Sequence, residues 1–157
     1  MVRKNRPNEG RSIRIVQAIQ RIHGSERHIR GPVGLQPYFT FGEGDILGLK
    51  GTIFGALADY KNVEGSSFTR LIVGYPSPAA AKEVLESLRA NLDPYLKITA
   101  TRPDGFDFID FQNKRGVVER RSGILDIRFK MAADHSRPPL SKNIAIALIF
   151  NKASASR

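Results

Sequence analysis

Two aspartates, Asp107 and Asp110, stand three positions apart in the aromatic segment GFDFIDFQN (105–113), and this spacing raises the question of a catalytic carboxylate pair. The flanking aromatic residues favour a β-strand. Residues three apart in a regular strand point to opposite faces, so the two carboxylates cannot reach one substrate atom. A bulge near Phe108–Ile109 would realign the apolar residues and the two acids with them. We interpret the aspartates as strand or bulge charges that discourage stray strand pairing.

Other motifs that carry chemistry are incomplete. Gly42, Gly44 and Gly48 are spaced G-x-G-x-x-x-G, one residue away from the dinucleotide-binding pattern, and no GK[ST] follows. The three histidines, His23, His28 and His135, suit neither an H-x-x-x-H metal motif nor a triad, and the chain has no cysteine. We therefore predict no catalytic, cofactor-binding or metal-ligating residue and no cofactor. An enzyme remains a minor alternative.

The net charge of +10 is concentrated at the two ends of the chain. Residues 1–30 carry a net charge of +6 and residues 137–157 a net charge of +4, whereas residues 31–136 are neutral. Such ends are typical of solvated tails or of arms that contact a polyanion. Both interpretations remain open, and oligomeric state and partners are not determined by the sequence.

A polyanion would be bound through phosphate contacts, because no aromatic RNA-binding motif or helix-turn-helix pattern supports the reading of bases. The basic residues placed at the N-terminal end or on a predicted hairpin are the candidates. The predicted polyanion-binding residues are Arg3, Lys4, Arg6, Arg11, Arg14, Arg21, Lys114, Arg115, Arg120 and Arg121.

Two helices are predicted. Residues 13–23 follow Ser12 as N-cap, place isoleucine and valine at helical spacing, and end at Gly24. Residues 78–92 follow Ser77 as N-cap and Pro78 at the first helical position. The apolar stripe of this second helix consists of Ala81, Val84, Leu85, Leu88 and Leu92. The segment between 25 and 37 is expected to form a loop.

Several strands are predicted around these helices. Residues 44–61 contain too many glycines for a helix and suggest two strands joined near Lys50–Gly51, with Leu47 and Leu49 on one face of the first. Residues 68–76 form another strand. Three segments after residue 104, ending at ILDIRFKM (124–131), form an antiparallel meander whose last strand has one buried and one solvated face. Residues 144–150 favour a strand over a buried helix.

Together these elements predict an α+β fold, an antiparallel sheet of about five to seven strands with the helix at 78–92 on one face and the helix at 13–23 beside it. The expected domains are a basic flexible arm (1–11), a single α+β domain (12–150) and a basic tail (151–157). No apolar stretch approaches the length of a membrane span, and no signal peptide is evident. The expected location is therefore cytoplasmic.

The segments GDILGLKGTIFGALADYK, TRLIVGYPSPAAAKEVLESLRANL and SGILDIRFK resemble, over about residues 44–130, the C-terminal half of a bacterial family of exported proteins of unknown function. The resemblance implies an α+β binding or interaction module without known enzyme activity. It also implies export, if the chain is an N-terminally truncated member of that family. The expected function is therefore a non-enzymatic binding or interaction domain, with a small nucleic-acid-associated protein as the alternative.

Overall fold

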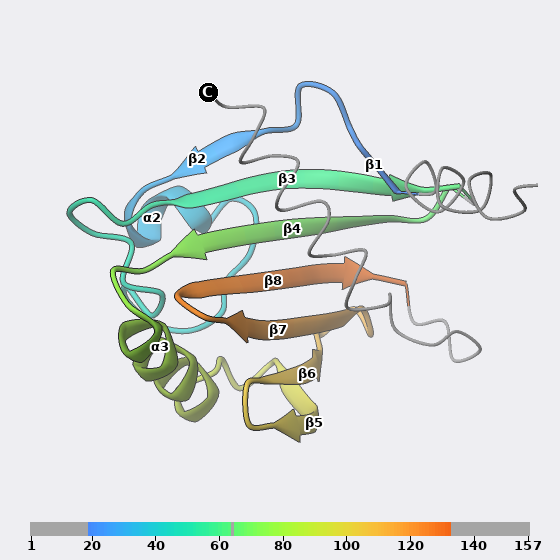
Figure 1. Cartoon of the computed structure of the whole chain (residues 1–157). Helices are drawn as coiled ribbons and strands as arrows, with labels where there is room; N and C mark the ends of the chain where they lie inside the picture. The colour runs from blue at the N-terminus through green and yellow to red at the C-terminus, as the bar shows by residue number, and fades with distance from the viewer. Residues whose placement is uncertain (1–18, 64, 133–157) are drawn as a thin grey trace, which may run out of the picture. The chain divides into compact units, whose positions relative to one another are not determined.

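The structure is a computed structural model that describes residues 19–63 and 65–132. Contacts between Cα atoms divide the chain into one unit of residues 21–133 and a second of residues 1–20 and 134–157. The described residues form eight strands and two helices (Figure 1). They are β1 (Ile19–Arg21), β2 (Arg27–Ile29), α2 (Gly31–Leu35), β3 (Gly55–Asn62), β4 (Ser67–Gly74), α3 (Pro78–Ala90), β5 (Lys97–Arg102), β6 (Gly105–Ile109), β7 (Arg115–Arg121) and β8 (Ile124–Met131).

The unit of residues 21–133 is built on one antiparallel sheet in the order β3-β4-β8-β7-β6-β5, with β2 paired to β3. Strands β6, β7 and β8 form the predicted meander, and β8 returns to pair with β4 so that Leu71 lies opposite Ile127. The α+β fold class and the antiparallel sheet are thus confirmed, with seven strands in this unit and, counting β1, eight among the described residues. Strand β5 was not predicted.

Helix α3 forms where its local signals place it. The Ser77 hydroxyl accepts a hydrogen bond from the Ala80 N–H at 3.1 Å, and Pro78 occupies the first turn. Ala81, Leu85 and Leu88 are fully buried, and the helix packs on β7 and β8. It ends at Ala90, two residues before its predicted end, and Val84 is only half-buried.

The core side of the sheet is closed by a long connection between α2 and β3. Its Phe39 and Phe41 rings lie 4.6 and 5.5 Å from the ring of Phe129 on β8. Leu47 and Leu49 of the same connection are 1% and 2% exposed. The connection therefore contributes to the core without contributing a strand to the sheet.

Three predictions of local structure need correction. The helix predicted over 13–23 is not found in its described part, where residues 19–21 form the strand β1. The Ile22 N–H donates to the Asp59 carbonyl of β3, whereas in a helix it would donate to the carbonyl four residues earlier. The loop predicted over 25–37 contains β2 and α2. The strand predicted before Lys50 is an irregular loop, since glycines at 44, 48 and 51 adopt positive φ angles that a strand does not allow.

The second face of β8 also differs from the prediction. Asp126 and Arg128 were expected in solvent, yet they are 0% and 5% exposed. Arg70 of β4 donates two hydrogen bonds to the Asp126 carboxylate, at 2.8 Å from Nε and 2.7 Å from Nη2. Such a bidentate pair allows both charges to be buried. The predicted strand at 144–150 lies outside the described residues.

Candidate ligand-binding groove

Two adjoining cavities lie on the core side of the sheet, where the α2–β3 connection meets the turn after α3. Their volumes are about 350 and 390 Å³, and both are lined by Gln36, Phe39, Thr40 and Asp93. We call them the first and second cavity and, together, the groove. Three segments that are distant in sequence form most of it, namely residues 32–49, residues 93–96 and the turn at 110–112 between β6 and β7, and Lys130 of β8 completes the lining.

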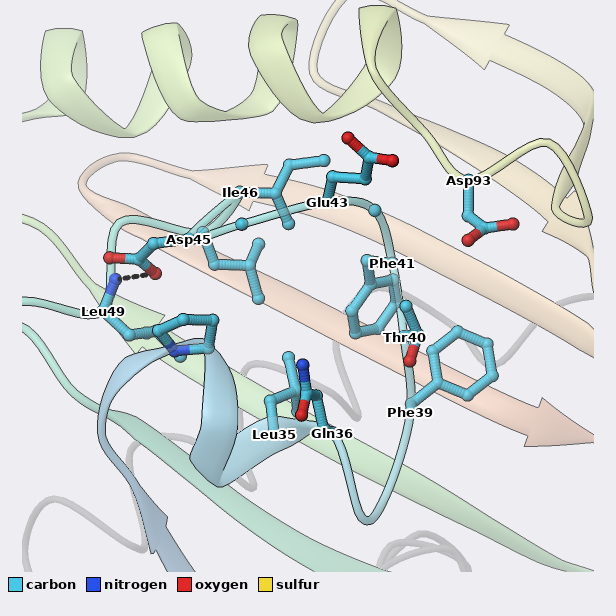
Figure 2. A pocket seen from close by; sticks show the side chains of 14 residues that line it. Leu35, Gln36, Phe39, Thr40, Phe41, Glu43, Asp45, Ile46, Leu49 and Asp93 are labelled. Carbon is cyan, nitrogen blue, oxygen red and sulfur yellow. Dashed lines mark hydrogen bonds between the residues drawn. The ribbon is translucent and has the colours of Figure 1, made fainter.

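The first cavity combines apolar walls with carboxylates (Figure 2). Leu35, Phe39, Phe41 and Ile46 are among its apolar lining residues. Its remaining lining residues are Pro32, Gln36, Thr40, Gly42, Glu43, Gly44, Asp45, Leu47, Leu49 and Asp93, so that three carboxylates and no lysine or arginine line it.

Backbone hydrogen bonds hold the loop that carries these carboxylates. Asp45 Oδ1 accepts from the Leu49 N–H at 2.8 Å, as drawn in Figure 2. The Asp93 N–H donates to the Phe41 carbonyl at 2.8 Å, which ties the loop to the end of α3. A side chain at Gly42 would meet the Asn91 carbonyl oxygen, 2.7 Å from its Cβ, so this close approach requires glycine.

Tyr75 anchors the same loop from the sheet, because its hydroxyl donates to the Leu47 carbonyl at 2.6 Å. Burial, and secondarily the charge of Asp45, raise the pKa of the Tyr75 phenol above its ordinary value of 10.0. The phenol therefore stays neutral in the folded protein at pH values where the unfolded chain ionises. Its contribution to stability is complete below about pH 10 and decreases as the pH rises further.

Replacement of Tyr75 tests this anchor. We expect Tyr75→Phe to lower the free energy of unfolding by about 0.5–1.5 kcal/mol at neutral pH, because the Leu47 carbonyl loses its partner. The difference between wild type and variant should shrink above about pH 10, where wild type loses the contribution of the raised pKa. Urea titrations of both proteins between neutral and alkaline pH measure this difference in the free energy of unfolding. A difference that stays constant with pH would contradict the role of the phenol.

The second cavity is lined by aromatic residues, two of which are largely exposed. The side chains of Tyr95 and Phe111 are 74% and 75% exposed, beside Tyr38 and Phe39. Its other lining residues are Gln36, Thr40, Asp93, Leu96, Asp110, Gln112 and Lys130.

The two aspartates of the aromatic segment do not form a pair. Asp107 lies on β6 and makes ion pairs with Arg102 at 2.8 Å and Arg115 at 3.3 Å. Asp110 follows the strand, and its Oδ1 accepts from the N–H groups of Gln112 and Lys114, which forms a turn. The register of β6 with β7 is continuous, so no bulge forms at Phe108–Ile109. The two carboxylates have separate structural partners.

The other candidate residues do not form a reactive cluster. No group of three or more metal-ligating side chains occurs among residues 19–63 and 65–132. His28 lies against Phe54, with ring centroids 5.3 Å apart, and His135 is outside the described residues. The glycine-rich loop presents carboxylates at the first cavity, and these would repel a phosphate.

The described members of the predicted polyanion-binding set mostly have acidic partners. Arg21 pairs with Glu26, Arg120 with Asp104 and Arg121 with Glu119. Arg115 shares Asp107 with Arg102, and Lys114 is half-buried, with its backbone N–H held by Asp110. The candidates at 3–14 lie outside the described residues, which are Arg3, Lys4, Arg6, Arg11 and Arg14. Polyanion binding stays a prediction.

The groove was not predicted from the sequence. The usable signal was the presence of large aromatic residues within turns, such as Phe39 two residues after Pro37 and Tyr95 directly after Pro94. Aromatic side chains in turns have no strand or helix face that buries them, so several of them indicate a loop-built core or a binding surface.

The fold and the groove define an α+β domain with a ligand-sized concave site. No family model, curated protein or solved structure matches the chain. Within the described part of the chain, no helix is both long and apolar enough to span a membrane. The resemblance to exported bacterial proteins stays an expectation, and the function has to be inferred from the groove.

Proposed function

We propose that this protein is a non-enzymatic binding domain and that its ligand lies in the groove, with an apolar or aromatic part of the ligand against Phe39, Tyr95 and Phe111. Cavities of this size are within the range of small-molecule sites, about 300–1,000 Å³. Such sites combine a mostly apolar lining with a few polar groups that fix orientation. The apolar walls and the carboxylates of the groove have this composition.

One observation carries the proposal. Tyr95 and Phe111 are about three-quarters exposed although they lie beside a cavity. Exposed aromatic side chains next to a concavity are enriched where ligands and partners bind, since they provide large apolar contact area at a small cost in side-chain entropy.

Binding is favoured over catalysis because three of the four carboxylates that line the groove are held in turns. Asp45, Asp93 and Asp110 each accept a hydrogen bond from a backbone N–H of their own turn, at 2.8 to 2.9 Å. These bonds fix the side chains as parts of turns. A general base would instead need its carboxylate within reach of a substrate proton and close to a nucleophile.

Isosteric aromatic probes test the proposal. We expect 2-phenylethylamine, 2-phenylethanol or phenylacetate to shift backbone NMR signals of residues 39–49, 93–96 and 110–112. Phe111→Ala should weaken the affinity of a bound probe by about five- to tenfold, because an aromatic contact is lost. Its folding stability should hardly change, since the side chain is largely exposed.

Val63→Ala is the matched control, because Val63 is a similarly exposed apolar residue, 77% exposed, that does not line the groove. It should leave probe affinity unchanged. The proposal fails if none of the three probes perturbs the groove, or if Val63→Ala and Phe111→Ala weaken binding equally.

A further inference from the structure

We propose that the first cavity selects an organic cation, specifically an ammonium group carried on an apolar body. This inference rests on the proposed function, since it assigns a ligand class to the same groove. It starts from the contrast between the charge of the chain, +10, and the charge of the cavity lining, which includes Glu43, Asp45 and Asp93 and no lysine or arginine.

Four carboxylates on or between the strands of the sheet have an arginine partner, whereas Asp59 of β3 accepts from the Thr69 hydroxyl. Asp104, Asp107, Glu119 and Asp126 each form an ion pair with at least one arginine. Within the described residues, Glu43 has no hydrogen-bond or ion-pair partner. Among the described residues, the first cavity thus keeps acidic groups without an ion-pair partner, and the basic residue that lines the groove, Lys130, belongs to the second cavity.

Glu43 and Asp93 both line the first cavity and both keep carboxylate oxygens without a partner among the described residues. Figure 2 shows both at the rim of the first cavity, with Asp93 beyond the end of α3. Oδ1 of Asp93 accepts from the Tyr95 N–H at 2.9 Å, and its Oδ2 has no partner among the described residues. The C-terminal end of α3 adds partial negative charge, because its last carbonyl groups point towards this end.

No basic side chain of α3 neutralises this end of the helix at the groove. Arg89, in its last turn, donates instead to the carbonyl groups of Arg102 and Gly105, at 2.8 and 3.1 Å on the sheet. An ammonium group at the rim would therefore meet carboxylates and helix carbonyls, whereas a carboxylate or phosphate would be repelled.

The apolar walls define the rest of the ligand. Phe39 and Ile46 are partly exposed apolar side chains of the cavity lining, and the aromatic face of Phe39 also attracts cations. A bare metal ion would gain nothing from these walls. An amine with a phenyl-sized or aliphatic body matches both the charge at the rim and the apolar surface of the lining.

The three isosteric probes separate charge from shape. At neutral pH and low salt, 2-phenylethylamine should bind wild type at least about tenfold more tightly than phenylacetate, with 2-phenylethanol in between. The preference should decrease as salt is added. The Glu43→Gln, Asp93→Asn double variant should lose about tenfold in affinity for the amine and keep its affinity for the alcohol within about twofold.

The substitutions are chosen to preserve the fold. The amide introduced by Asp93→Asn would still present an oxygen to the Tyr95 N–H, so the turn after α3 is kept while the charge is removed. Glu86→Gln is the control, because Glu86 is an exposed carboxylate of α3 that does not line either cavity. It should change the affinity for the amine by less than about twofold, as expected for a carboxylate away from the site.

Each outcome decides one question. Equal affinity for the amine, the alcohol and the acid would overturn the selection of a cation and leave the binding groove in place. An equal loss for the double variant and Glu86→Gln would also overturn it, because the effect would then reflect the overall charge of the protein. If no probe binds, the proposed function itself fails.

Discussion

Asp126→Asn is expected to lower the free energy of unfolding by about 3–5 kcal/mol, because it leaves a buried arginine without its charged partner. Arg70 is 3% exposed and donates to both carboxylate oxygens of Asp126. Burial lowers the pKa of Arg70, but the hydrogen bonds and charge of Asp126, together with Tyr60, outweigh this effect and hold the pKa above its ordinary value. Urea denaturation followed by circular dichroism measures the loss.

A second carboxylate serves as control for this prediction. Asp104 also pairs with an arginine, but its side chain is 61% exposed, so Asp104→Asn should cost no more than about 1 kcal/mol. The joint replacement Arg70→Met, Asp126→Leu should be less destabilising than Asp126→Asn alone, since no unpaired charge is left. Equal losses for Asp126→Asn and Asp104→Asn would show that the buried pair has no special importance for stability.

Leu88→Ala is expected to cost about 2–5 kcal/mol of unfolding free energy, through lost apolar burial and the cavity that remains. Leu88 is fully buried on the face of α3 that packs on β7 and β8. Alanine is the best helix former, so the loss reflects packing and not helix propensity. Denaturant titration of the purified variant provides the value.

Val84→Ala provides the comparison on the same helix. Val84 is only half-buried, and its truncation removes fewer buried atoms, so the loss should be clearly smaller than for Leu88. A loss below about 0.5 kcal/mol for Leu88→Ala would mean that the predicted stripe does not anchor the helix, contrary to its burial.

The elements that were predicted correctly are those whose signals are local. Ser77, Pro78 and the leucine stripe specify α3 within one short segment. The strand predicted in the aromatic segment also forms as β6, and its Phe106 and Phe108 are both buried. In each case neighbouring residues contain the whole pattern, and the fold agrees with it.

The elements that were missed depend on partners far away in the sequence. Asp126 alternates with apolar residues as a solvated strand residue would, and only its pairing with Arg70, 56 positions away, explains its burial. Residues 19–21 carry a helical pattern, but Ile22 bonds to Asp59. The groove could not be predicted for the same reason, because Glu43, Asp93 and Phe111 meet only after the sheet and α3 have brought three turns together.

The irregular connection between α2 and β3 can change in sequence without affecting the pairing of the strands. It supplies most of the lining of the first cavity, yet none of the residues from 36 to 54 takes part in the strand pairing of the sheet. Exposed rim positions such as Glu43 can therefore be exchanged without disturbing the ladder of backbone hydrogen bonds. Under the proposed function, ligand preference could diversify on this framework by substitution at the rim, and libraries randomised there would be a route to engineered binders.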